Sequence, residues 1–143
     1  MQQLQAIGPG AAPPVVSSER FQRVLTVAIN QMRTPPVDLA HDEMHLHRVI
    51  AKAREIGIAE GADLEVLLPA AALHDVVNVP KDHPDREQAS AMAADAARPI
   101  LAEAGYTDLE IATIAQVILE HSFSAGRKPS SLESAVLQDA DRL

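Results

Sequence analysis

The amino-acid sequence predicts an all-α domain, on three grounds. Ala and Leu favour helices and are abundant, whereas aromatic residues make up 2% of the chain and Trp is absent. The sequence has no regular succession of short Val-, Thr- and Tyr-rich runs, which would be typical of strands. Apolar residues instead recur with the 3.6-residue period of a helix, between recognisable start and stop signals. At 143 residues the chain has the length of one domain.

The first helix is predicted to follow an N-terminal tail. Residues 1–17 are rich in Gly and Pro and are expected to be flexible, so the domain itself is expected to span residues 18–143. Ser17 or Ser18 is the expected cap, and Pro35 ends the helix. Its apolar stripe is Phe21, Val24, Leu25, Ala28, Ile29 and Met32.

Two further helices are expected in the next third of the chain. One covers about residues 42–59 and ends at Gly57 or Gly61; its buried stripe is Val49, Ile50, Ala53 and Ile56. The other is capped by Asp63, and its apolar segment is expected to stay helical to about Val76.

Three more helices are expected toward the C-terminus. The fourth covers about residues 85–104 and stops before Gly105. Thr107 and Glu110 resemble a capping box for a fifth helix that reaches His121. Ser131 is expected to cap a sixth helix over residues 132–143.

Composition and charge exclude several classes of function. The formal charge of −8 argues against a nucleic-acid surface, which needs clustered Lys and Arg. Because Cys is absent, disulfides, thiolate metal sites and a Cys nucleophile are excluded. No apolar run reaches membrane-spanning length and no signal peptide opens the chain, so we expect a soluble, cytoplasmic protein with no membrane partner.

Titratable side chains occur where the sequence is most apolar. His74 and Asp75 end the run "LLPAAAL", and an ionised carboxylate buried without a partner is costly. His45 lies four residues before Val49 on the buried stripe of its predicted helix, whereas His47 should point to solvent. Near the C-terminus, Asp141 adjoins the inward face, and Asp139 is the competing acid on the other side. A metal ion and a hydrogen-bonded structural network are both compatible with these positions.

Two imidazoles and two carboxylates form a donor set that suits a divalent transition metal. Manganese is the first expectation. Iron, cobalt, nickel, zinc and magnesium are the alternatives, and calcium fits less well.

The order of these motifs has a known parallel. The parallel rests on four segments: "HDEMHLHRV", "LHDVVNVPKDHPDR", "EHSFSAG" and "LQDADRL". Together they resemble the HD-domain superfamily of metal-dependent phosphohydrolases, over about residues 38–143. The similarity is greatest to small bacterial HD hydrolases, some of which split nucleotide phosphoanhydrides. The resemblance implies a bundle of about six helices with a central metal site. It also implies four ligands: His45, His74, Asp75 and Asp141, with Asp139 in reserve.

The resemblance also implies roles in catalysis and binding. A bound metal would lower the pKa of a water and polarise a phosphoryl oxygen, and Asp75 would accept a hydrogen bond from that water. His121 is expected to donate to a phosphate or act as general acid, unless it is only a favourable charge at a helix end. The expected phosphate-binding residues are Arg48, Lys81 and Arg86, and Arg127 and Lys128 are weaker candidates. The expected substrate is a small phosphorylated compound such as a nucleotide.

Two features support an alternative function. Some HD nucleotidases carry an acid three or four residues after the His-Asp pair, where this chain has Asn78 and Val79. Asp141 also lies two residues before the last residue, so we expect a longer natural chain, or a homodimer partner or earlier helix that holds this segment. The alternative is a catalytically inactive HD module that binds metal or nucleotide.

Overall fold

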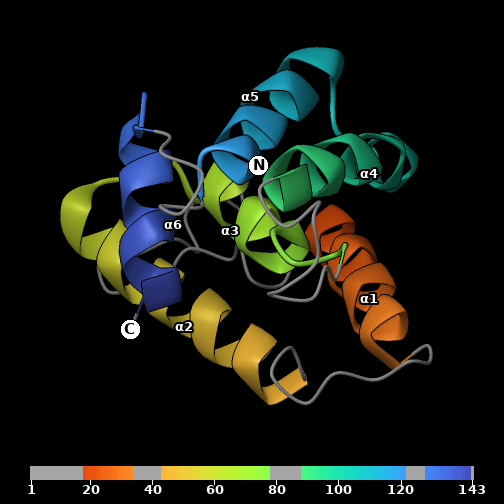
Figure 1. Ribbon diagram of the computed structural model, residues 1–143, viewed down its shortest axis with the longest axis horizontal. Coiled ribbons are helices and arrows are strands. Elements are labelled where there is room, and N and C mark those ends of the chain that lie inside the picture. The colour runs from red at the N-terminus through yellow and green to blue at the C-terminus, as the bar shows by residue number, and fades with distance from the viewer. Residues whose placement is uncertain (1–17, 34–42, 78–87, 122–127, 143) are drawn as a thin grey trace, which may run out of the picture.

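The computed structural model describes residues 18–33, 43–77, 88–121 and 128–142, and it confirms the all-α prediction. No strand occurs within these ranges. The six helices are shown in Figure 1: α1 (Glu19–Arg33), α2 (Glu43–Glu60), α3 (Leu64–Leu73), α4 (Ala89–Ala104), α5 (Asp108–Leu119) and α6 (Leu132–Arg142).

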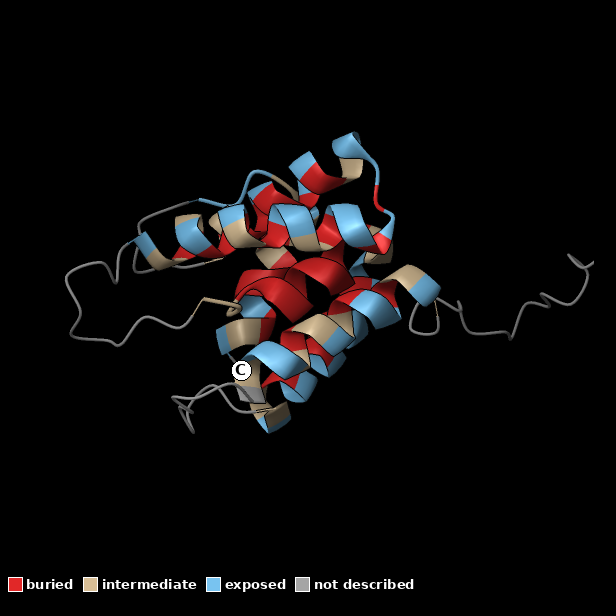
Figure 2. Ribbon diagram, turned by 90° about the vertical axis from the view of Figure 1, so that its right-hand side faces the viewer, coloured by how far each residue is buried: buried red, intermediate tan, exposed pale blue. Residues whose placement is uncertain are grey.

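Helix α3 forms the centre of the bundle. Every residue from Val66 to Leu73 is buried, and all five other helices contact α3. In Figure 2 this helix is buried on all sides, whereas the surrounding helices alternate between buried and exposed faces. A helix that is apolar around its whole circumference is stable in water only when other elements surround it. The apolar segment before His74 therefore carries that histidine into the core.

Four of the predicted helix starts are confirmed by their caps. The side chain of Ser18 accepts a hydrogen bond from the Phe21 amide at 3.2 Å, and Asp63 accepts one from the Glu65 amide at 3.0 Å. Thr107 and Glu110 form the predicted capping box. Ser131 accepts from the Ser134 amide at 3.1 Å. These contacts satisfy amide groups that have no partner within their own helix.

Two predicted helix ends are wrong, and both fall at histidines. Helix α3 ends at Leu73 rather than near Val76, and α5 ends at Leu119 rather than at His121. At both places an amide bonds to the carbonyl three residues earlier, as in Val76 to Leu73 at 3.1 Å. Such bonds tighten the last turn and take the chain out of the α-helix. The ends of α2 and α4 agree with the left-handed backbone of Gly61 and Gly105 (φ 81° and 108°).

Helices α1, α3 and α5 are joined by a single cation. The guanidinium of Arg20 bonds to both carboxylate oxygens of Glu110 at 2.8 and 2.7 Å and to Glu65 at 3.0 Å. It also lies 4.1 Å above the ring of Tyr106. The hydrogen bond from Arg20 and the Thr107 amide lower the pKa of Glu110 to about 2.

Helix α2 packs very closely on α3. A Cβ atom added to Gly57 would lie 2.6 Å from Cδ2 of Leu67, so no larger residue fits without displacing the core.

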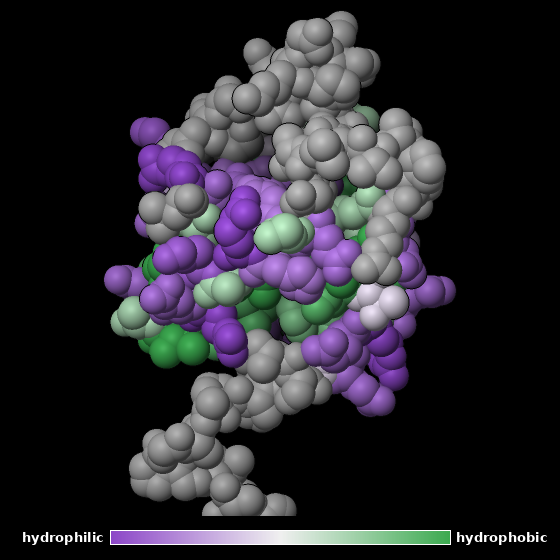
Figure 3. All heavy atoms as spheres, turned by 90° about the horizontal axis from the view of Figure 1, so that it is seen from below, coloured by the Kyte–Doolittle hydropathy of each residue, from purple (hydrophilic) through white to green (hydrophobic). Residues whose placement is uncertain are grey.

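Figure 3 shows the surface of the molecule from below, where the described side chains are mainly hydrophilic, with smaller hydrophobic areas between them. None of the described helices has both the length and the apolar character needed to cross a membrane. The tail, residues 1–17, lies outside the described residues, so its flexibility stays a prediction.

Candidate metal centre

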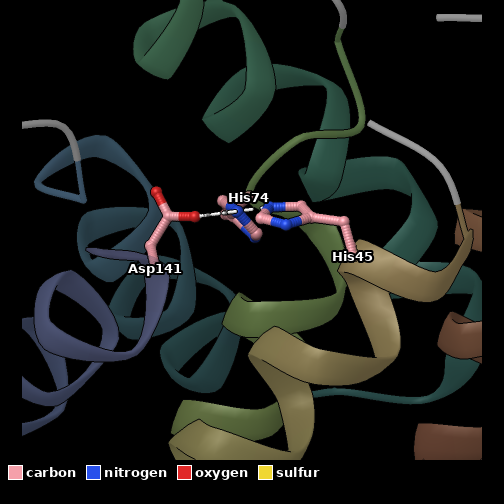
Figure 4. Close-up of side chains that lie close together, drawn as sticks. All are labelled: His45, His74 and Asp141. Carbon is pink, nitrogen blue, oxygen red and sulfur yellow. Dashed lines mark hydrogen bonds and ion pairs between the residues drawn. The ribbon is translucent and has the colours of Figure 1, made fainter. Parts of the chain in front are cut away.

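Side chains from three helix ends converge beside the core. His45 lies in the first turn of α2, His74 directly follows α3, and Asp141 lies in the last turn of α6. Figure 4 shows these three side chains pointing toward one another from their separate helices. The fold therefore brings together His74 and Asp141, which are 67 positions apart in the sequence.

His74 has one ring nitrogen bonded to the backbone and the other facing carboxylates. Its Nδ1 lies 2.7 Å from the carbonyl oxygen of Ala71, and since a carbonyl only accepts, Nδ1 donates. The Nε2 atom lies 3.2 Å from Oδ1 of Asp141 and 3.4 Å from Oδ2 of Asp75. Histidines that bind metals commonly have this arrangement, because the backbone bond fixes the tautomer and turns the other nitrogen to the ion.

The spacing of the donor atoms fits a single metal ion. Nε2 of His45 lies 3.6 Å from Oδ1 of Asp141 and 4.0 Å from Oδ2 of Asp75. One donor atom each of His45, His74 and Asp141 lies within 4.8 Å of the other two. Two ligands that each bind an ion at about 2.0–2.2 Å lie roughly 3–4 Å apart. Oδ2 of Asp75 lies close to both imidazoles, so Asp75 borders this group.

The charges at the centre favour a cation. Burial alone would lower the pKa of His74, but the charge of Asp75 and the hydrogen bond to Asp141 outweigh burial and raise it to about 9. Burial alone would raise the pKa of Asp141, and its contact with His74 lowers it instead. The centre therefore stabilises one positive charge between these groups, which can be a proton or a metal ion.

Asp139, the reserve ligand, lies away from the centre. Its side chain is exposed, and its Oδ1 accepts a hydrogen bond from Arg142 at 2.8 Å. Because Asp139 and Asp141 are two residues apart on one helix, they point in very different directions. Of these two acids, the structure brings only Asp141 to the histidines.

His121 borders the centre from the end of α5. Its ring meets that of His74 edge-on, with 5.0 Å between centroids, and its Nδ1 donates to the Ile118 carbonyl at 2.7 Å. Burial lowers the pKa of His121, and the positive charge of His74 lowers it further. The neutral ring then has a lone pair at Nε2. This geometry suits accepting a proton better than donating one, and a catalytic role for His121 stays a prediction.

The predicted phosphate-binding residues are only partly described. Arg48 lines a cavity of about 330 Å³ that also includes His45 and Asp141. Lys128 is exposed and is not among the residues that line this cavity. Three of the predicted cations, Lys81, Arg86 and Arg127, lie outside the described residues.

Glu120 is an important residue that sequence reasoning missed. It is buried, and its carboxylate accepts four hydrogen bonds of 2.6–2.9 Å, from Ser134, from Gln116, and from both the amide and the hydroxyl of Ser130. Burial alone would raise its pKa, but these bonds lower it to about 2. Its backbone carbonyl accepts a further bond from Gln138 at 2.6 Å.

The Glu120 network fixes α6 to the end of α5. Ser134 and Gln138 both belong to α6, which carries Asp141, and Glu120 directly precedes His121. Helix α6 also packs on α2 and α3. Earlier helices therefore hold α6, the segment that carries Asp141. In the sequence, Glu120 is the first residue of the segment "EHSFSAG", and its local signal is an acid beside a histidine at a helix end.

Comparisons with known proteins identify a family and two similar structures. A family model described as HD domain matches residues 43–143. Two crystal structures are similar: a predicted HD superfamily hydrolase from an uncultured Thermotogales bacterium (28% identity, TM-score 0.66) and a protein from Lactobacillus plantarum (31% identity, TM-score 0.69). These matches cover 85% and 86% of this chain, but 66% and 55% of the other chains. The chain thus spans less than two thirds of either neighbour. No curated protein matches it.

The family match includes every residue of the converging group. His45, His74 and Asp141 come from three separate helices inside the matched range, in the order that the sequence resemblance implied. The chain belongs to the HD domain family.

Proposed function

We propose that this protein is a metal-dependent phosphohydrolase that cleaves a phosphate ester or phosphoanhydride of a nucleotide or similar small molecule. The observation that carries the proposal is the position of His74. Its Nδ1 donates to a backbone carbonyl, while its Nε2 faces carboxylate oxygens at 3.2 and 3.4 Å. Membership of the HD domain family and the similarity to a predicted hydrolase support the same class of reaction.

A neutral His74 cannot be stable in this position without a cation. The lone pair on its Nε2 would face the negative oxygens of Asp75 and Asp141, and this repulsion is strong in a buried site. A proton on Nε2 of His74 would relieve the repulsion, but binding that proton would require only one imidazole. The structure supplies a second imidazole, His45, at 3.6 Å from the same oxygen of Asp141. Two nitrogen and two oxygen donors around one point suit a divalent metal, with manganese as the first candidate and iron, cobalt, nickel, zinc or magnesium as alternatives.

The protein's own residues then have distinct tasks. A divalent ion supplies a water of lowered pKa and polarises the phosphoryl oxygen. Asp75 is about one-fifth exposed, so its carboxylate can accept a hydrogen bond from a water that enters from solvent. Arg48, in the cavity wall beside His45, binds a phosphate oxygen of the substrate. The side chain of His74 is fully buried, so it fixes the position of the centre relative to the core.

The proposal is tested by metal binding and by phosphate release. The protein is stripped with a chelator, loaded with each candidate metal and assayed for bound metal by elemental analysis. Release of phosphate or pyrophosphate is then measured on nucleoside mono-, di- and triphosphates. We expect His74→Ala and Asp75→Ala to lose both metal and activity while keeping most of the helix content by circular dichroism. His47→Ala is the matched control, because His47 is exposed on α2 and pairs with Glu43 at 3.5 Å.

Two other results would point elsewhere. Metal binding without turnover of any substrate in the panel would favour the inactive HD module, which the lack of an acid at Asn78 and Val79 also suggests. The absence of bound metal, with no stabilisation by any added ion, would leave a structural His-Asp network and refute the proposal.

A further inference from the structure

A cavity extends from the candidate metal centre between α2 and α6. Its volume is about 330 Å³, within the range of cavities that hold small ligands. At one end it is bounded by His45 and Asp141, the candidate ligands. Within the described part of the chain, its other charged lining residues are Arg48, Lys52, Glu55 and Arg142.

The cations on α2 form a row that leads away from the centre. Arg48 is three residues after His45, and Lys52 is four residues after Arg48, so the three side chains lie on one side of the helix. At a rise of about 1.5 Å per residue, Arg48 lies roughly 5 Å and Lys52 roughly 10 Å along the axis from His45. A ligand with one end at the centre therefore meets Arg48 first and Lys52 next.

The cavity wall differs in charge from the rest of the protein. The chain has a formal charge of −8, yet among the described residues three cations line this cavity, and Glu55 is the one acid besides Asp141. Lys52 lies 3.5 Å from Glu55, and both side chains are more than half exposed. Exposed pairs of this kind contribute little stability. Lys52 can therefore turn from Glu55 to an anionic ligand at small cost.

We propose that Lys52 and Arg48 form a subsite for a second phosphate group, one that is not cleaved at the centre. The substrate class that fits has at least two linked phosphates, such as a nucleoside diphosphate or triphosphate. Lys52 makes the protein prefer these compounds to monophosphates. The proposal rests on the proposed function for the cleaved phosphate, but the subsite itself is a property of the cavity.

Direct binding tests the subsite without any turnover. Inorganic orthophosphate and tripolyphosphate are titrated calorimetrically into metal-free protein. We expect tripolyphosphate to bind more tightly than orthophosphate. Lys52→Ala should weaken tripolyphosphate binding about tenfold, the loss expected for one charge-assisted contact. It should weaken orthophosphate binding by a clearly smaller factor, because a single phosphate can bind at Arg48 alone. Glu55→Gln should tighten tripolyphosphate binding, because it removes the carboxylate that pairs with Lys52.

Arg54→Ala is the matched control for these variants. Arg54 is exposed on α2, two residues after Lys52, and does not line the cavity. The substitution removes the same charge from the same helix and should leave both affinities unchanged. An equal loss in Lys52→Ala and Arg54→Ala would show only a general charge effect and would overturn the subsite.

Steady-state kinetics separate the subsite from the proposed function. Lys52→Ala should raise KM for a nucleoside triphosphate about tenfold, with kcat nearly unchanged and KM for a monophosphate unaffected. If the wild-type protein hydrolyses nothing but the binding pattern holds, the proposed function fails and the subsite stands. If hydrolysis is metal-dependent but both phosphates bind equally well, the subsite is wrong and the proposed function stands.

Discussion

Replacing Glu120 by Gln tests how α6 is held. The carboxylate of Glu120 accepts hydrogen bonds from Ser134, Ser130 and Gln116, and the residue is 5% exposed. Gln has nearly the same shape, but it lacks the charge. Its NH₂ group would also face donors where Glu120 offers only acceptors, so at least one of these bonds is lost or must reverse its direction.

The size of the effect follows from the pKa of Glu120. The folded protein lowers this pKa from 4.5 to about 2. Since each pKa unit corresponds to about 1.4 kcal/mol, the ionised form is stabilised by roughly 3 kcal/mol at neutral pH. Glu120→Gln should therefore lower the free energy of unfolding by about 2–3 kcal/mol, which corresponds to a fall in Tm of roughly 10 °C for a domain of this length.

The pH dependence has a defined sign. Because the folded-state pKa is lowered, the contribution of Glu120 is complete above pH 4.5 and is lost as the pH falls toward 2. The stability difference between the wild-type protein and the variant should therefore shrink between about pH 5 and pH 2. Urea unfolding followed by circular dichroism at several pH values measures this difference.

A control and a second measurement complete this test. Glu103→Gln changes an exposed acid on α4 and should alter stability by less than about 0.5 kcal/mol. Because α6 carries Asp141, Glu120→Gln should also bind manganese more weakly under conditions where it is fully folded. A stability loss below about 0.5 kcal/mol, or one that does not change with pH, would refute the account of the Glu120 network.

Three further predictions concern other contacts. Metal affinity should rise with pH up to about 9, because His74 holds a proton below its raised pKa and the metal must displace that proton. Calorimetry in two buffers should find that metal binding releases about one proton at pH 7. Metal binding without proton release would contradict this prediction. Arg20→Lys should lower stability by about 1–2 kcal/mol in urea unfolding, since it loses the paired bonds to Glu110, while metal affinity stays at the wild-type value. Gly57→Ala should lower stability by about 1–2 kcal/mol despite the better helix propensity of Ala, because the new Cβ would meet Leu67; a higher Tm would show that the α2–α3 contact is looser than described.

Local signals in the sequence were sufficient to predict the helices. The caps at Ser18, Asp63, Thr107 and Ser131 are side chains that bond to amides two or three residues away, so neighbouring residues alone determine them. The end at Gly105 is equally local, because its left-handed backbone favours glycine. The apolar segment before His74 also predicted burial, and α3 proved to be the centre of the bundle.

The ends of α3 and α5 were wrong for a physical reason. Leu73 is followed by His74 and Asp75, and Leu119 by Glu120 and His121. None of these four residues is a strong helix breaker, so propensity alone gives no cause to stop at Leu73 or Leu119. The ring nitrogens of His74 and His121 bond to carbonyls three residues earlier, and the chain leaves the helix there. The apolar pattern carries no information about these bonds.

The sequence by itself determined the helical class, the helix starts and a short set of residues able to bind a metal. Periodicity, caps and residue chemistry act over a few positions, so they can be read from the chain directly. The tertiary structure decided which of these residues meet. It brought Asp141 rather than Asp139 to His74, tied α6 to α5 through Glu120, and placed Arg48 and Lys52 along one cavity. These choices depend on how helices distant in sequence pack around α3, and a contact between residues far apart in the chain leaves no local pattern to detect.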